Sequence, residues 1–175
     1  AFPSVAHDFL IEALRARGLP EGFVQTVMGL YQSVFAISSV DKRTVLFEVS
    51  SGVLQGCPAS GALFTLLCDP LLRFLHEVEG ASSVLRACAD DLGQVFNSLK
   101  VVKRMLPAFI RIAAASGLRL KPAKCILILF GTFSSEELAS LRRYLADVAP
   151  EWANLTVARA GLYLGFWIGP AAALE

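Results

Sequence analysis

The sequence predicts an α+β fold, in which helices alternate along the chain with short antiparallel hairpins. Segments with apolar residues three and four positions apart alternate with short runs rich in β-branched and aromatic residues. Two pairs of these runs are separated by a few polar residues, which is the pattern of a β-hairpin. The chain has 175 residues, of which 55% are hydrophobic and 18% charged, so it is predicted to fold as one well-packed domain.

Five segments have the periodicity of amphipathic helices. They are residues 4–18, 20–35, 58–80, 99–117 and 134–148. Pro20 is suited to the first turn of the second helix, and Ser134 with Glu137 has the spacing of a capping box at the start of the last one. Pro70 and Pro107 fall inside the third and fourth patterns, where we expect them to kink or weaken the helix.

The remaining apolar runs are predicted to be strands. They cover residues 35–40, 44–49, 83–89, 92–98, 118–121, 125–130, 155–160 and 162–169. The first two runs are divided by "DKR", and the next two flank a pair of aspartates, so each of these pairs is predicted to form a hairpin.

Charge and cysteine content exclude several classes of function. The net charge of +1 gives no overall basic character, so any nucleic acid must be held by a local patch or by metal ions. Cys57, Cys68, Cys88 and Cys125 form no cluster with zinc-ligand spacing, and we expect them to be core thiols of a protein in a reducing compartment. No signal peptide and no apolar run of about 20 residues is found, which predicts a soluble protein that is not secreted, in the nucleus or cytoplasm.

The stretch "VLRACADDLGQVF" places Asp90 and Asp91 side by side between two predicted strands. Two carboxylates at a hairpin tip can together hold a divalent cation, which prefers hard oxygen ligands and offsets their mutual repulsion. The alternative is an ordinary polar turn, because aspartate is common in turns.

A second stretch, "SGVLQGCPASGALF", joins a glycine-rich loop to a predicted helix. Gly52 and Gly56 permit close approach of the backbone, and Gln55 supplies an amide group. Pro58 and Ser60 begin a helix whose free N–H groups favour anions, so the loop can cradle a phosphate or a sugar. The alternative is a connecting loop without a ligand.

Read together, these motifs resemble those of reverse transcriptases, particularly those of non-LTR retrotransposons. "GVLQGCPAS" is similar to motif B, and "CADDL", about thirty residues later, is similar to motif C. "AFPSVAH" resembles the end of motif A, "ASGLRLKPAKC" motif D and "LYLGFWIG" motif E. The resemblance covers nearly the whole chain and implies a polymerase-type palm, with an antiparallel sheet backed by helices, together with part of the fingers.

The resemblance implies a catalytic role for a few residues of the palm. Asp90 and Asp91 match the motif C pair that holds two magnesium ions, for which manganese can substitute. Lys124 matches the motif D lysine that neutralises or protonates pyrophosphate, and its alternative is a solvated surface lysine. Leu164 and Gly165 match the motif E hairpin near the primer grip, and their alternative is a buried strand.

The resemblance also implies a set of substrate-binding residues. Phe2 matches the motif A aromatic that lies under the sugar of the incoming deoxynucleoside triphosphate, although it could be an ordinary core residue. Gln55, Gly56, Pro58 and Ser60 belong to the motif B segment that lines the nucleotide pocket. The implied partners are an RNA template and a DNA primer, with no membrane.

The sequence departs from the family pattern at three points. The motif A aspartate would stand four residues before the alanine of "AF" and is therefore not among these 175 residues, so we expect the chain alone not to polymerise. Cys88 stands where relatives usually carry Tyr or Phe, and Pro3 where many carry an acidic residue. The abrupt start, and an end before any thumb, predict a palm and fingers fragment over residues 1–175.

Three functions are therefore open from the sequence. The first is the RNA-directed DNA polymerase of a retroelement. The second is a degenerate or repurposed palm that binds nucleic acid or a protein partner without catalysis. The third is a magnesium-dependent phosphotransfer domain unrelated to polymerases.

Overall fold

The computed structural model describes residues 2–80 and 83–174, and it divides them into two compact units. Ala1, the first residue of the expected motif A segment, lies outside the described residues, as do Ala81, Ser82 and Glu175. The first unit comprises residues up to Glu77 and Ala108–Arg119, and the second comprises Val78–Pro107 and residues from Leu120 onwards. Whereas the chain length predicts one domain, the unit boundaries fall within two long helices.

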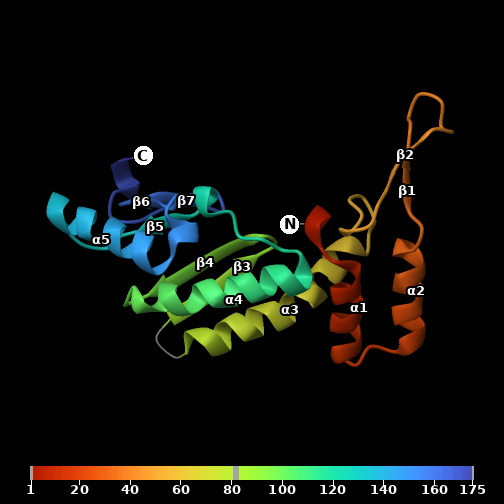
Figure 1. Ribbon diagram of the computed structural model, residues 1–175, viewed down its shortest axis with the longest axis horizontal. Coiled ribbons are helices and arrows are strands. Elements are labelled where there is room, and N and C mark those ends of the chain that lie inside the picture. Colours follow the sequence, from red (N-terminus) through yellow and green to blue (C-terminus); the bar gives the residue numbers. More distant parts are fainter. Residues whose placement is uncertain (1, 81–82, 175) are drawn as a thin grey trace. The chain divides into compact units, whose positions relative to one another are not determined.

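The first unit contains two helices, a β-hairpin and parts of both long helices (Figure 1). Its elements are η1 (Phe2–Ser4), α1 (His7–Ala16), α2 (Glu21–Tyr31), β1 (Phe35–Ile37), β2 (Val45–Glu48), most of α3 (Ser60–Glu79) and the end of α4 (Lys100–Ser116). Strands β1 and β2 are antiparallel, with an irregularity between Ala36 and Ile37. The sequence predicts that α2 continues to Phe35, but the helix ends at Tyr31 and Phe35 begins β1.

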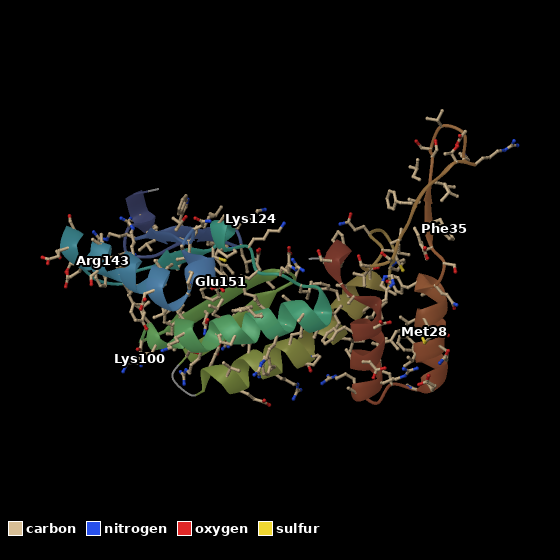
Figure 2. All side chains as sticks on the ribbon, in the orientation of Figure 1. Met28, Phe35, Lys100, Lys124, Arg143 and Glu151 are labelled. Carbon is tan, nitrogen blue, oxygen red and sulfur yellow. The ribbon has the colours of Figure 1, made fainter. Side chains whose placement is uncertain are left out.

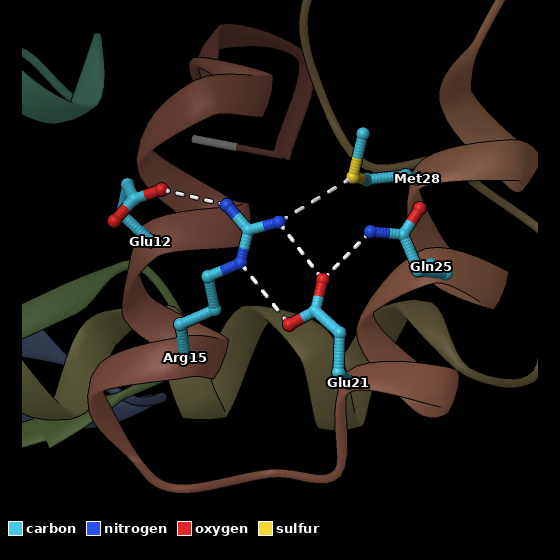
Figure 3. Close-up of polar contacts among 5 residues, drawn as sticks. All are labelled: Glu12, Arg15, Glu21, Gln25 and Met28. Carbon is cyan, nitrogen blue, oxygen red and sulfur yellow. Dashed lines mark hydrogen bonds and ion pairs between the residues drawn. The ribbon is translucent and has the colours of Figure 1, made fainter.

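Apolar side chains on one face of α1 and α2 form much of the core of the first unit. The buried residues of these two helices are Leu10, Ala13, Leu14, Val24, Val27 and Tyr31. On the exposed side, an ion-pair network joins the two helices (Figure 3). Arg15 donates to Glu12 at 3.0 Å and to both carboxylate oxygens of Glu21, and hydrogen bonds to Arg15 and Gln25 lower the pKa of Glu21.

The second unit contains three two-stranded sheets, one further α-helix and the start of α4. Its elements are β3 (Ser83–Cys88), β4 (Asp91–Phe96), the start of α4, η2 (Pro122–Lys124), β5 (Ile126–Ile128), α5 (Ser135–Val148), η3 (Pro150–Trp152), β6 (Thr156–Ala158), β7 (Gly161–Tyr163), β8 (Phe166–Ile168) and η4 (Ala172–Leu174). The β3–β4 and β7–β8 pairs are antiparallel, whereas β5 and β6 are parallel, with Ile126 opposite Thr156.

The described residues therefore confirm an α+β chain of helices and small, mostly antiparallel sheets. The predicted capping box is present, because the Ser134 hydroxyl accepts from the Glu137 N–H and the Glu137 carboxylate accepts from the Ser134 N–H. Helices α3 and α4 continue through Pro70 and Pro107. The prediction of a strand at 118–121 is wrong. The single strand predicted from periodicity at 162–169 is also wrong, because β7 and β8 form a hairpin there, as the resemblance to motif E implies.

Candidate active site

The aspartate pair lies at the turn between β3 and β4. Cys88 is opposite Asp91 in the register, so Ala89 and Asp90 form a two-residue turn and Asp91 is the first residue of β4. Both aspartates are exposed. The sequence thus correctly predicts a hairpin that presents two neighbouring carboxylates, one in the turn and one on the strand.

The turn holds an alanine in the left-handed region of backbone conformation. Ala89 has a φ of +50°, which is unfavourable for a residue with a Cβ. Tight hairpins require positive φ at a turn position, and glycine supplies it without the steric cost. The backbone beside the aspartate pair is therefore strained.

Replacing Ala89 by glycine is expected to raise the free energy of unfolding by roughly 0.5–1 kcal/mol, because glycine relieves the strain at positive φ. Urea unfolding followed by circular dichroism measures the change. Ala87→Gly is the matched control: Ala87 lies in β3, where glycine only weakens the strand and stability should fall. Equal destabilisation by both substitutions would contradict the strain at Ala89.

The side chains on one face of the β3–β4 hairpin follow from its regular register. Asp91, Gly93 and Val95 project from one face of β4. Their partners on β3 project from the same side of the hairpin, and these are Cys88, Arg86 and Val84. Arg86 and Cys88 are exposed, as Asp91 is. The face that carries Asp91 therefore also carries a guanidinium group two residues from Cys88.

The expectation that all four cysteines are core thiols is wrong for Cys88, which is exposed because it lies on the open face of β3. Cys57, Cys68 and Cys125 are half-buried. Burial raises the pKa of the Cys68 thiol to about 11 and also raises that of Cys125. Both thiols are therefore protonated and unreactive near neutral pH.

The motif A and motif B segments lie side by side in the first unit. The Val53 N–H donates to the Phe2 carbonyl at 2.9 Å, and the Gly52 N–H donates to the Val5 carbonyl at 2.7 Å. The Phe2 ring stacks on Phe64 of α3, with 4.3 Å between ring centroids and 11° between planes. The half-buried Phe2 is thus held against the first turns of α3.

The loop after Val53 exposes three of the predicted substrate-binding residues. Gln55, Gly56 and Pro58 are exposed, and Gly56 has a φ of +89° with open space where a Cβ would lie. Ser60 is different: its side chain is buried and its hydroxyl donates to the Leu54 carbonyl. Ser60 therefore fixes the loop to the start of α3 and does not itself point to solvent.

The remaining predicted residues lie in the second unit with the aspartate pair. Leu164 and Gly165 form the turn between β7 and β8, with φ of +51° and +84°. Leu164 is 45% exposed, so the alternative of a buried strand is wrong for this residue. Lys124 is exposed at the end of η2, where Figure 2 labels it.

Two residues beside Asp91 were missed in the sequence. Arg86 could have been found from strand alternation, because it lies two residues before Cys88. Tyr163 has no sequence pattern that points to the site. Its ring lies over Gly93, and a Cβ built on Gly93 would be 3.1 Å from the Tyr163 Cζ. A contact between strands seventy residues apart cannot be read from local periodicity.

The donor set of the aspartate pair suits a hard divalent cation. Two exposed carboxylates on a short turn offer the oxygen ligands that magnesium prefers, and magnesium usually completes its coordination with water and substrate phosphates. Among residues 2–80 and 83–174, no group of three or more His, Cys, Asp or Glu side chains gathers at a possible metal site. The pair alone therefore offers only part of a coordination shell.

Within the described part of the chain, no helix has the length and apolar character needed to cross a bilayer.

Similarity to known proteins agrees with these motifs. The family model of reverse transcriptase (RNA-dependent DNA polymerase) matches residues 1–168. A retrovirus-related Pol polyprotein from the type-1 retrotransposable element R2 of Bradysia coprophila is 31% identical over 174 residues, which cover 94% of this chain and 20% of that protein. A Pol polyprotein from the type-2 element R2DM of Drosophila melanogaster is 32% identical over 73% of this chain and 13% of its own length.

A further relative is an uncharacterised 149 kDa protein of transposon TX1 from Xenopus laevis, which is 29% identical over 94% of this chain and 13% of its own length. The chain thus spans a fifth or less of these three relatives. The R2 relatives confirm the resemblance to the non-LTR type, and the family match rules out an unrelated phosphotransfer domain. The chain belongs to the reverse transcriptase (RNA-dependent DNA polymerase) family.

Proposed function

We propose that this chain is the palm, with part of the fingers, of a retroelement polymerase that copies RNA into DNA by adding deoxynucleotides to a primer 3′-hydroxyl. The observation that carries the proposal is the exposed Asp90–Asp91 pair on a tight hairpin in a chain of this family. An RNA template, a DNA primer and deoxynucleoside triphosphates are the corresponding partners. An intracellular location, in the nucleus or cytoplasm, is part of the same proposal.

Asp90 and Asp91 are the residues that would hold two magnesium ions, or manganese in their place. When bound, such ions polarise the primer hydroxyl and neutralise charge on the triphosphate. The hairpin fixes the backbone of Asp91, because Asp91 is paired with Cys88 in the sheet. The exposed Lys124 ammonium is suited to charge neutralisation at the leaving pyrophosphate.

The first unit would supply contacts to the incoming nucleotide. The Phe2 ring is held by Phe64, so it offers a rigid apolar surface for a sugar. Gln55 presents an exposed amide, and Gly56 and Pro58 leave the loop backbone accessible. Ser60 acts on this loop indirectly, through the Leu54 carbonyl.

The β7–β8 turn would contact the primer strand. Leu164 adopts positive φ although it has a branched side chain, and strain of this kind is often retained at functional sites. Leu164 and Gly165 would therefore present an exposed apolar tip to the primer.

Primer extension tests the proposed function. A polypeptide that carries these residues together with an aspartate four positions before Ala1 is given an RNA template, a DNA primer, deoxynucleotides and magnesium. We expect extension that stops with EDTA and with a primer ending in a 3′-deoxynucleotide. The 175 residues alone are expected to give none, because they contain only two of the three carboxylates that the family uses.

Failure of extension with template binding intact would instead support the repurposed palm. Cys88 is the observation that favours this alternative, because a small, exposed thiol stands where relatives usually carry an aromatic ring. Cys88→Tyr restores the aromatic ring and separates the repurposed palm from the polymerase. A repurposed palm should still not extend the primer, whereas a polymerase should keep or gain primer extension.

Arg86 is expected to contact a backbone phosphate of the bound strand, because its exposed guanidinium lies on the Asp91 face. Arg86→Ala should weaken template–primer binding for all sequences alike and reduce the slope of log affinity against log salt by about one. Fluorescence anisotropy at several salt concentrations measures both quantities. Arg143→Ala, on α5, is the control with no expected change, and an unchanged slope in Arg86→Ala would remove Arg86 from the interface.

A further inference from the structure

The strand that begins with Asp91 is in close contact with Tyr163 of β7. A Cβ built on Gly93 would lie 3.1 Å from Cζ, 3.3 Å from the hydroxyl oxygen and 3.4 Å from Cε2 of Tyr163. Gly93 is two residues after Asp91 in an unbroken register, so both positions project from the same face of β4. The Tyr163 ring therefore lies against β4 at Gly93, on the face that presents the Asp91 carboxylate.

The opposite face of β4 is held by a different set of contacts. The Gln94 side-chain amide donates to the Glu79 carboxylate at 2.8 Å, and Glu79 is fully buried. Arg104 donates to the Glu79 carbonyl at 3.1 Å, which ties α4 to the same point. A two-stranded hairpin is only marginally stable by itself, so these contacts and the Tyr163 ring together hold β4 from both faces.

Tyr163 is in turn fixed by the parallel β5–β6 sheet. Tyr163 is opposite Phe166 in the β7–β8 hairpin, and Gly161 begins the same strand. A Cβ on Gly161 would lie 3.2–3.4 Å from the Ile126 and Ile128 side chains, so β7 approaches β5 closely at this point. A continuous line of packing therefore runs from β5 through Gly161 and Tyr163 to Gly93.

We propose that Tyr163 is a positioning residue for the metal-binding aspartate, acting through its ring contact with Gly93. The inference rests on the proposed function and adds a named residue to it. Ligating groups must be held within about half an ångström of their working geometry by neighbours that are themselves locked by packing. A Cβ on Gly93 would force the ring to move by a few tenths of an ångström, and a bulkier side chain would displace the ring further.

The metal dependence of primer extension by the longer polypeptide, which carries the motif A aspartate, tests the proposal. In Tyr163→Ala the magnesium concentration at half-maximal rate is expected to rise about tenfold, as for other residues that orient metal ligands. The KM for the deoxynucleotide should change less than twofold. Tyr163→Phe keeps the ring and should behave as the wild type. Leu162→Ala, on the outer face of the same strand, is the matched control with no expected effect.

A double-variant cycle identifies Gly93 as the partner. Gly93→Val introduces a side chain that suits a strand but displaces the ring, and should also raise the magnesium requirement. The magnesium requirement of Gly93→Val/Tyr163→Ala should be no higher than that of the more severe single variant, because both substitutions remove the same contact. If the rise in magnesium requirement of the double variant equals the product of the two single rises, the two residues act independently and the proposal is overturned.

Hydrogen–deuterium exchange gives a readout that does not need activity. Tyr163→Ala should speed exchange of the amides of residues 91–96, whereas Tyr163→Phe and Leu162→Ala should not. If the longer polypeptide that carries the motif A aspartate fails to extend a primer, the proposed function is wrong, and the exchange rates still decide whether Tyr163 holds β4. Exchange in Tyr163→Ala equal to that in Leu162→Ala would overturn the role of Tyr163 in either case.

Discussion

Replacing Asp91 by asparagine is expected to lower the rate of nucleotide addition by about a thousandfold, in the range found when one charge-stabilising group is removed from a polar active site. Asparagine has nearly the same shape, so the pairing of residue 91 with Cys88 and the hairpin itself should persist. What is lost is one negative charge and one strong oxygen ligand for the divalent ion. Single-turnover primer extension in magnesium measures the rate, with the wild type and the variants made in the longer polypeptide that carries the motif A aspartate.

The affinity for template and primer separates this effect from general damage. Asp91→Asn should bind the template–primer within about twofold of the wild type, because the substitution adds no bulk and removes a charge that repels phosphates. Asp147→Asn, on the exposed side of α5, is the control and should keep the full rate. A rate within tenfold of the wild type in Asp91→Asn would contradict the assignment of the metal site.

Replacing Gly52 by alanine is expected to destabilise the first unit by roughly 2–4 kcal/mol, which is a large part of the stability of an ordinary domain. Gly52 has a φ of +93°, and an added Cβ would lie 2.7 Å from the Pro3 Cα and 2.9 Å from its carbonyl group. The backbone must shift, which breaks the 2.7 Å hydrogen bond from Gly52 to Val5 and the 2.9 Å one from the His7 ring to the Gly52 carbonyl. Thermal unfolding measures the loss.

Gly18→Ala is the matched control for Gly52→Ala. Gly18 also has positive φ, at +72°, but an added Cβ would meet nothing within 4 Å. Gly18→Ala should therefore lower the free energy of unfolding by only about 1 kcal/mol, which is the cost of placing a residue with a Cβ at positive φ. Equal losses in the two variants would mean that the motif A and motif B segments are not packed as closely as described. Phe2 should also become more accessible to solvent in Gly52→Ala alone.

Local patterns were sufficient to predict the helices and two of the hairpins. The apolar spacing of α1, the capping box of α5 and the polar "DKR" between β1 and β2 are each encoded within a few residues. The predicted strand at 118–121 fails because its alternation has no strand to pair with in the described chain. The parallel β5–β6 pair joins residues thirty positions apart, and local sequence does not determine such a pairing.

The candidate site was predictable where the chemistry is carried by adjacent residues. The Asp90–Asp91 pair and the Gln55–Gly56 loop could be identified because each is a short motif. Ser60 shows the limit of this approach, since a buried hydroxyl bonded to Leu54 and an exposed substrate contact look alike in sequence. Tyr163 could not be found, because the contact with Gly93 exists only once β7 and β4 are folded.

Iron-mediated cleavage tests most directly whether the β3–β4 turn binds a divalent metal. Ferrous iron in place of magnesium, with ascorbate and peroxide, generates hydroxyl radicals that cut the backbone beside the bound ion, and mass spectrometry locates the cuts. We expect cleavage within residues 86–93 that is suppressed by excess magnesium and lost in an Asp90→Ala/Asp91→Ala variant. Cleavage that spares this turn, or that persists in the variant, would contradict a metal-dependent polymerase site at the aspartate pair.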